Sequence, residues 1–222
     1  MSEAPAIGIV CEGDTDEIVL RAILSVVAGE HRARLVQPER TRFAGGGYGV
    51  YGGGWKGVRE WCRAQGRLSE ALASAPLSRF AALIMHLDAE VAGEREVGCE
   101  QPCPPASASV EALRAFVLCE WCGEDTLPPR AVFCIPSKST EAWVFVGLYP
   151  EDKHATPDVE CRPKPETLLK QRPDELVSGA ENRKNTAAFR EVAPRVAAAW
   201  PRVCEVCTQA ARFDRDLRAV LR

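Results

Sequence analysis

The chain has 222 residues, of which 46% are hydrophobic and 27% charged, a composition ordinary for one folded domain or a domain with a small appendage. No apolar run approaches the ~18 residues that a membrane span needs, and no basic residue precedes the first apolar run. The sequence therefore predicts neither a transmembrane helix nor a signal peptide, no membrane partner, and a cytoplasmic location.

The formal net charge of −3 hides an asymmetry along the chain. Residues 1–161 hold 15 Lys and Arg against 23 Asp and Glu, a balance of −8, and residues 162–222 hold 13 against 8, a balance of +5. An acidic body with a basic C-terminal third could pair metal chemistry with a polyanionic ligand. The alternative is an unevenly charged, solvated surface.

The first half of the chain alternates predicted strands and helices. Residues 6–11 are short, continuous and apolar, which is typical of a buried strand. Asp14 and Glu17 have the spacing of a capping box and open a predicted helix whose residues are apolar on most sides. Further strands are predicted at 33–43 and 80–87, with a helix between them at 56–74.

The second half continues this alternation and then becomes helical. A helix is predicted at 107–122, a strand at 131–135 and a short helix at 141–148. A proline-rich linker at 149–165 precedes a mostly helical remainder. The order predicts an α/β domain at 1–150, with a mainly parallel sheet and helices on both faces, and a helical extension at 151–222 packed on the same core.

Acidic residues follow the two most apolar predicted strands. Glu12 follows the first strand, and Asp88 and Glu90 follow the strand at 80–87. In parallel sheets, functional sites lie beyond the C-terminal strand ends, and residues i and i+2 of an extended chain point to one side. Three converging carboxylates predict a Mg²⁺ or Mn²⁺ site that could activate water against a phosphate. The alternative is a helix start beside an exposed acidic loop.

Polar residues also follow the strand at 131–135. Beside a metal, Lys138 could offset phosphate charge and Glu141 could act as a further ligand or a base. The competing interpretation places Glu141 in the first turn of a helix with no catalytic task. Lys164 and Lys184 could meet a nucleic-acid backbone or belong to ordinary surface.

Three motifs together resemble the Toprim domain of topoisomerases, primases and OLD-type nucleases. They are 12-EGDTD-16, 88-DAE-90 and 135-IPSKSTEAW-143, and Glu90 stands where the family pattern has an aspartate. The resemblance is closest to small bacterial Toprim-like proteins, some encoded near phage-defence systems. It implies a Toprim-like fold, a metal-dependent nuclease acting on nucleic acid, and a partner protein from a defence operon.

The glycine-rich segment at 44–57 has eight glycines in fourteen residues but lacks the order of a P-loop. Its backbone amides and aromatic rings could cradle a phosphate or stack on an unpaired base. A mobile loop without a ligand is the alternative.

The ten cysteines are expected to be reduced in a cytoplasmic protein. Cys99, Cys103, Cys119 and Cys122 have a spacing compatible with a structural zinc site. Cys204 and Cys207, with Cys161, suggest a weaker second site. Ordinary core packing is the alternative for both sets, and Cys11, Cys62 and Cys134 are expected in the core.

The sequence thus favours a Mg²⁺-dependent nuclease or phosphotransferase that uses Glu12, Asp88 and Glu90, assisted by Glu141 and Lys138. Two other functions stay open: a non-catalytic binding subunit of a defence complex, and an enzyme acting on small nucleotides. The oligomeric state is not predicted.

Overall fold

Four parallel strands form the central sheet of the computed structural model, which describes residues 4–40, 47–170 and 172–222. The strand order is β2-β1-β3-β4, and each adjacent pair is parallel. The strands are β1 (Ala6–Val10), β2 (Arg32–Gln37), β3 (Ala82–His86) and β4 (Ala131–Cys134). The predicted α/β class with a parallel sheet is therefore confirmed.

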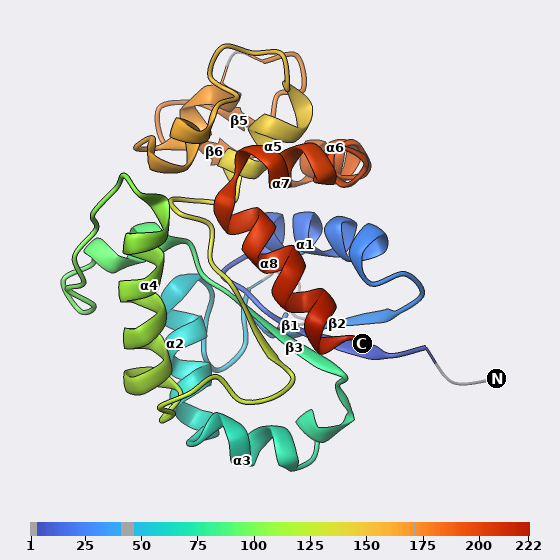
Figure 1. Cartoon of the computed structure of the whole chain (residues 1–222), viewed down its shortest axis with the longest axis vertical. Helices are drawn as coiled ribbons and strands as arrows, with labels where there is room; N and C mark the ends of the chain where they lie inside the picture. The colour runs from blue at the N-terminus through green and yellow to red at the C-terminus, as the bar shows by residue number, and fades with distance from the viewer. Residues whose placement is uncertain (1–3, 41–46, 171) are drawn as a thin grey trace.

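Helices cover both faces of this sheet (Figure 1). One face packs with α1 (Asp14–Val27), α5 (Glu141–Leu148), α6 (Thr186–Ala198), α7 (Trp200–Val206) and α8 (Thr208–Val220). The other face packs with α2 (Gly54–Gln65), α3 (Leu68–Ala73) and α4 (Ala106–Phe116). Short helical turns complete the chain: η1 (Leu77–Arg79), η2 (Ala89–Gly93), η3 (Val117–Trp121), η4 (Pro157–Cys161) and η5 (Pro165–Leu169).

The strands β1, β3 and β4 are largely apolar because both of their faces are buried, whereas the edge strand β2 carries exposed Arg32 and Arg34. Ile7 and Ile9 of β1 pack into the cluster around α1, whereas Val10 packs into the cluster around α2. All five residues of β3 are fully buried, so the central strand reaches no solvent along its length.

The C-terminal extension belongs to the same hydrophobic cluster as α1 and the sheet. Helix α6 packs against α1, and α8 crosses in front of the sheet and contacts β4 (Figure 1). The prediction of a mostly helical segment at 166–222 omitted a small antiparallel hairpin, β5 (Val177–Ser178) and β6 (Arg183–Lys184). Strands of two residues carry no periodicity that a sequence pattern could reveal.

Two local predictions differ from the structure. The helix predicted at 56–74 is interrupted at Gly66, whose φ of 67° lies in the left-handed region that glycine tolerates. Asp14 does not cap α1: Gly13 holds the cap position without a side-chain bond, and Asp14 instead pairs with Arg40 at 3.0 Å. Across the described residues, no helix has the length and apolar character that a membrane crossing needs.

The cysteines depart from both sequence expectations. Cys103 and Cys161 form a disulfide, so they are not reduced thiols and neither can belong to a thiolate zinc site. Cys119 is exposed, whereas Cys122 is buried against Cys62, and no three cysteine sulfurs of the described residues come close enough to share a metal ion. The structure therefore brings neither predicted set of zinc ligands together. The expected core positions of Cys11, Cys62 and Cys134 are confirmed.

The disulfide is expected to stabilise the fold measurably. It joins residues 58 apart in sequence, and closing a loop of that size restricts the unfolded chain, which typically contributes about 2–4 kcal/mol. Urea denaturation with and without a phosphine reductant should show that loss on reduction. A Cys103→Ser/Cys161→Ser variant should be insensitive to reductant, and identical curves for the wild type in both conditions would contradict the prediction.

Candidate metal centre

Glu12 and Asp88 meet at the C-terminal edge of the sheet. Adjacent strands β1 and β3 are in register with Val10 opposite Met85, so the residues that follow both strands emerge at one level. The backbone N–H of Asp88 donates to Oε1 of Glu12 at 2.8 Å. The structure thus brings together the two acids that the sequence predicted as neighbours.

His86 is a third member of this group, and the sequence analysis missed it. One ligand atom from each of Glu12, His86 and Asp88 lies within 4.8 Å of the others. His86 is the last residue of β3 and is fully buried, two residues before Asp88 and thus on the same side of the chain. A histidine two residues before a predicted ligand, on the same side of an extended chain, is the sequence signal that points to it.

Thr140 fixes the position of Asp88 from the start of α5. Its backbone N–H donates to Oδ1 of Asp88 at 3.1 Å, and its hydroxyl lies 3.4 Å from the same oxygen. The Thr140 hydroxyl also lies 2.8 Å from Nε2 of His86. The loop between β4 and α5 therefore orients the acid and the imidazole together.

The electrostatics of this group favour a bound cation. Burial, followed by repulsion from Asp16, raises the pKa of Glu12 from 4.5 to about 8, and the same two causes raise the pKa of Asp88 well above its usual range. Asp16 is itself buried, and its Oδ1 has no hydrogen-bond partner among the described residues. Acids that repel one another and an unsatisfied carboxylate oxygen fit a divalent ion at this position.

The imidazole of His86 is suited to binding a metal ion. Burial lowers its pKa, so the neutral form, which has a free lone pair, is favoured. Mg²⁺ prefers oxygen ligands, so a set of two carboxylates and one imidazole suits a softer transition-metal ion such as Mn²⁺ better than it suits Mg²⁺. Glu12, Asp88 and His86 are therefore the residues that would hold the ion.

Lys184 brings a positive charge to this acidic edge from the C-terminal hairpin. Its Nζ lies 2.6 Å from Oε1 of Glu141, whose side chain is buried, while 34% of the lysine side chain stays exposed. Partial burial alone would lower the pKa of Lys184, but Glu141, Asp16 and Asp88 raise it above its usual value. Lys184 is thus a charged neighbour of the site, and Glu141 is its counter-ion and lies outside the three-residue group.

Glu90 does not join Glu12 and Asp88. The chain turns into η2 directly after Asp88, so the extended geometry that would align residues i and i+2 is absent. Glu90 is exposed, and its pKa is raised by partial burial and by Glu166 and Glu141. The prediction that Glu90 completes the metal-binding group is therefore wrong. Lys138 stays near Glu90 at the rim, where its carbonyl accepts the Glu90 N–H at 3.3 Å.

The described part of the glycine-rich segment, residues 47–57, borders the site; residues 44–46 lie outside the described chain. The N–H of Gly54 donates to the carbonyl of Glu12 at 2.7 Å, and the Gln37 side chain donates to the carbonyl of Gly52 at 2.6 Å. A Cβ on Gly53 would lie 2.3 Å from the ring of Tyr48, so this ring rests on the backbone where α2 begins.

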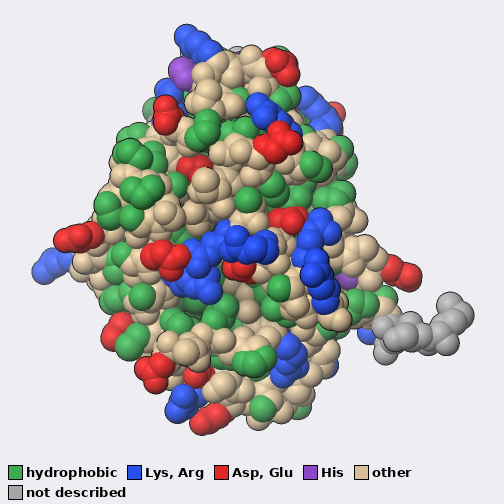
Figure 2. Space-filling view, viewed as in Figure 1, with side chains coloured by type: hydrophobic (Ala, Val, Ile, Leu, Met, Phe, Trp, Pro, Cys, Tyr) green, Lys and Arg blue, Asp and Glu red, His purple; other side chains and the backbone are tan. Residues whose placement is uncertain are grey.

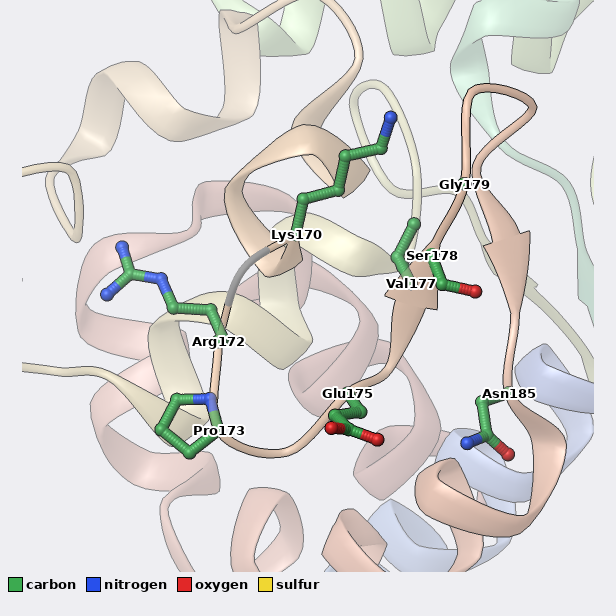
Figure 3. A pocket seen from close by; sticks show the side chains of 8 residues that line it. All are labelled: Lys170, Arg172, Pro173, Glu175, Val177, Ser178, Gly179 and Asn185. Carbon is green, nitrogen blue, oxygen red and sulfur yellow. The ribbon is translucent and has the colours of Figure 1, made fainter.

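A pocket of about 920 Å³ lies beside the β5–β6 hairpin, and the acids of the candidate site do not line it. Figure 3 shows Lys170 and Arg172 on its wall pointing in different directions. Arg172 is paired with Asp152 at 2.8 Å, so its charge is already balanced. The two basic side chains of this pocket thus do not converge on one point, and the pocket supports a specific ligand less well than the acidic group does.

Arginines of the basic C-terminal third form ion pairs both within this third and with the preceding part of the chain. Figure 2 shows Lys and Arg side chains over the face of α8 with acidic side chains among them. Arg218 pairs with Asp214 at 2.8 Å, and Arg212 pairs with Glu111. This arrangement agrees with an unevenly charged, solvated surface.

Comparison of the chain with protein-family models, curated proteins and solved structures found no match. The carboxylates, the imidazole and the lysine at the edge of the sheet are therefore the features of this chain that point to a function.

Proposed function

We propose that this protein is a divalent-metal-dependent nuclease or phosphotransferase that acts on nucleic-acid phosphodiesters. The observation that carries the proposal is the convergence of Glu12, His86 and Asp88 within 4.8 Å at the ends of two adjacent parallel strands. The Toprim-like motifs in the sequence support nucleic acid as the substrate and a role in phage defence.

Each residue has a task in this proposal. The bound ion would supply a Lewis acid and a water of lowered pKa. Glu12, Asp88 and His86 hold it, Thr140 keeps Asp88 and His86 in position, and Lys184 offsets negative charge at the phosphate. We assign this role to Lys184 and not to Lys138, because the Lys184 ammonium group pairs with Glu141 beside the acids.

A cleavage panel tests the proposal. Purified protein is incubated with single- and double-stranded DNA and RNA in Mg²⁺, Mn²⁺ or EDTA, and products are resolved on denaturing gels. Cleavage that requires metal, and that is faster with Mn²⁺ than with Mg²⁺, is the expected result. Absence of cleavage on every substrate would contradict the proposal and favour a non-catalytic binding subunit.

The dependence of metal binding on pH follows from the raised pKa of Glu12. The metal-free folded protein keeps a proton on Glu12 up to about pH 8, whereas the unfolded chain loses it near 4.5. The folded state thus binds more protons, and its stability should fall as pH rises through this window. A cation displaces that proton, so the increase in melting temperature caused by Mg²⁺ or Mn²⁺ should grow from pH 6 to pH 8.

Thermal-shift measurements at constant ionic strength check this prediction. The Glu12→Gln variant is the control, because it has no proton to exchange at this position and its metal response should be small at every pH. A metal-induced shift in the wild type that is equal at pH 6 and pH 8 would contradict the assignment of Glu12 as a ligand.

A further inference from the structure

A groove of about 440 Å³ runs along β2, the edge strand of the sheet. It lies on the side of β2 opposite to β1. Residues from both faces of the sheet line it, since α1 contributes one wall and η1 the other. Its charged lining residues are Arg21, Arg34, Arg40, Arg79, Glu17 and Glu39. The lining is therefore basic on a protein that is acidic overall.

The positive charge of the groove is only partly balanced. Glu17 is buried and already bound by Arg21, at 2.7 Å, and by Arg40. Arg34 is exposed and forms no ion pair with any residue that the structure describes, and the Arg79 guanidinium lies 5.1 Å from the centre of the Phe80 ring. Four arginines line the groove, and a planar guanidinium group can form two parallel hydrogen bonds with a phosphate. The groove therefore suits a ligand with repeated phosphates.

The glycine-rich segment contacts both the Glu39–Arg40 end of the groove and the backbone of Glu12. Arg40 forms a β-bridge with Tyr48, and the carbonyl of Glu39 accepts the N–H of Gly49 at 2.6 Å. The Tyr48 side chain is 41% exposed, and its ring rests on Gly53, the residue before the one that bonds to the carbonyl of Glu12. An aromatic face is thus presented between the arginines and the proposed metal ligands.

A peptide strand added to the edge of β2 is the competing occupant. Such a strand needs free backbone groups along β2. Nη1 of Arg21 already donates to the carbonyl of Ala33 at 2.9 Å, and the arginine side chain lies over that edge. The contact disfavours strand addition and leaves the guanidinium groups as the recognition elements.

We propose that this groove binds single-stranded nucleic acid, with phosphates on Arg34 and Arg79 and an unpaired base stacked on Tyr48. A paired base could not stack on the ring, so an unpaired strand is preferred over a duplex. The choice of nucleic acid as the ligand rests on the proposed function, whereas the position of the groove rests on its own contacts.

Fluorescence anisotropy with a labelled 20-nucleotide oligo-dT, measured in EDTA with the full-length protein, tests binding without cleavage. Arg34→Glu and Arg79→Glu should each weaken binding about 10-fold, and Tyr48→Ala by a similar factor. Each arginine replaced should also reduce the slope of log affinity against log salt by about 0.7. Arg190→Glu, the same charge change at an exposed position on α6, should bind like the wild type.

Three results would overturn the inference. The first is equal affinity of the Arg34→Glu and Arg190→Glu variants for oligo-dT, and the second is tighter binding of a blunt duplex than of oligo-dT. The third is displacement of the labelled oligo-dT by a glutamate-rich peptide at a lower concentration than by unlabelled oligo-dT. Arginine-dependent binding without metal-dependent cleavage would support the groove and refute the proposed hydrolysis. Metal-dependent cleavage that the arginine changes leave unaffected would support the proposed hydrolysis and refute the groove as the binding site.

Discussion

Glu12→Gln is expected to lower metal-dependent cleavage at least about a thousand-fold, or about 4 kcal/mol of transition-state stabilisation, while raising the stability of the metal-free protein. The amide oxygen of glutamine can still accept the Asp88 N–H that now bonds to Oε1. The charge that would hold the ion is lost, and so is the repulsion between Glu12, Asp16 and Asp88. Activity and stability should therefore change in opposite directions.

The two quantities are measured on the same samples, cleavage by gel assay and melting temperature by differential scanning fluorimetry in EDTA. At pH 8 the melting temperature should rise by about 2–4 °C for each kcal/mol of relieved repulsion. Asp88→Asn should behave in the same way, whereas Glu94→Gln, an exposed acid beyond η2, should change neither quantity. Full activity in Glu12→Gln, or a lower melting temperature, would contradict the metal-centre assignment.

Trp143→Ala is expected to lower the free energy of unfolding by about 3–5 kcal/mol. Trp143 is fully buried in α5, its ring meets that of Trp200 edge-on at 5.6 Å, and it stacks on Phe213 at 6.3 Å. The three rings connect α5 with α7 and α8, so the cavity would open where the C-terminal helices meet the rest of the fold. Such a cavity collapses poorly because aromatic side chains surround it.

Urea denaturation followed by tryptophan fluorescence and by far-ultraviolet circular dichroism measures this effect. Trp143→Phe keeps an aromatic ring at the position and should lose less stability than the alanine variant. Both probes should report one transition, since the extension shares its hydrophobic cluster with α1 and the sheet. Two separate transitions, or a loss below about 1 kcal/mol, would contradict a common core.

The sequence was sufficient for the sheet and for two of the three residues of the candidate metal-binding group. Glu12 and Asp88 could be predicted because each follows a strand that is almost entirely apolar, and parallel strands bring their C-terminal ends to one edge. His86 lies two residues before Asp88, so the alternation of side chains along a strand predicts that both point to the same side. Because His86 lies in an otherwise apolar segment, its sequence context indicates core packing and not metal binding.

The remaining errors have local or long-range causes. Glu90 left the predicted group because the chain turns into η2 immediately after Asp88, and an i, i+2 rule holds only for extended backbone. Lys184 and the Cys103–Cys161 disulfide each join segments distant in sequence. These contacts form only when the extension folds back over the sheet. The spacing of residues along the chain does not predict that packing.

The contact between Lys184 and Glu141 also sets an order for assembling the site during synthesis. Proteins emerge from the ribosome N-terminus first, so the acids at positions 12, 16, 88 and 141 are available before the lysine that balances them. Until the β5–β6 hairpin emerges, the partly made chain holds these carboxylates without their internal cation. The charges of the candidate site are therefore balanced only late in translation, after the C-terminal segment has emerged.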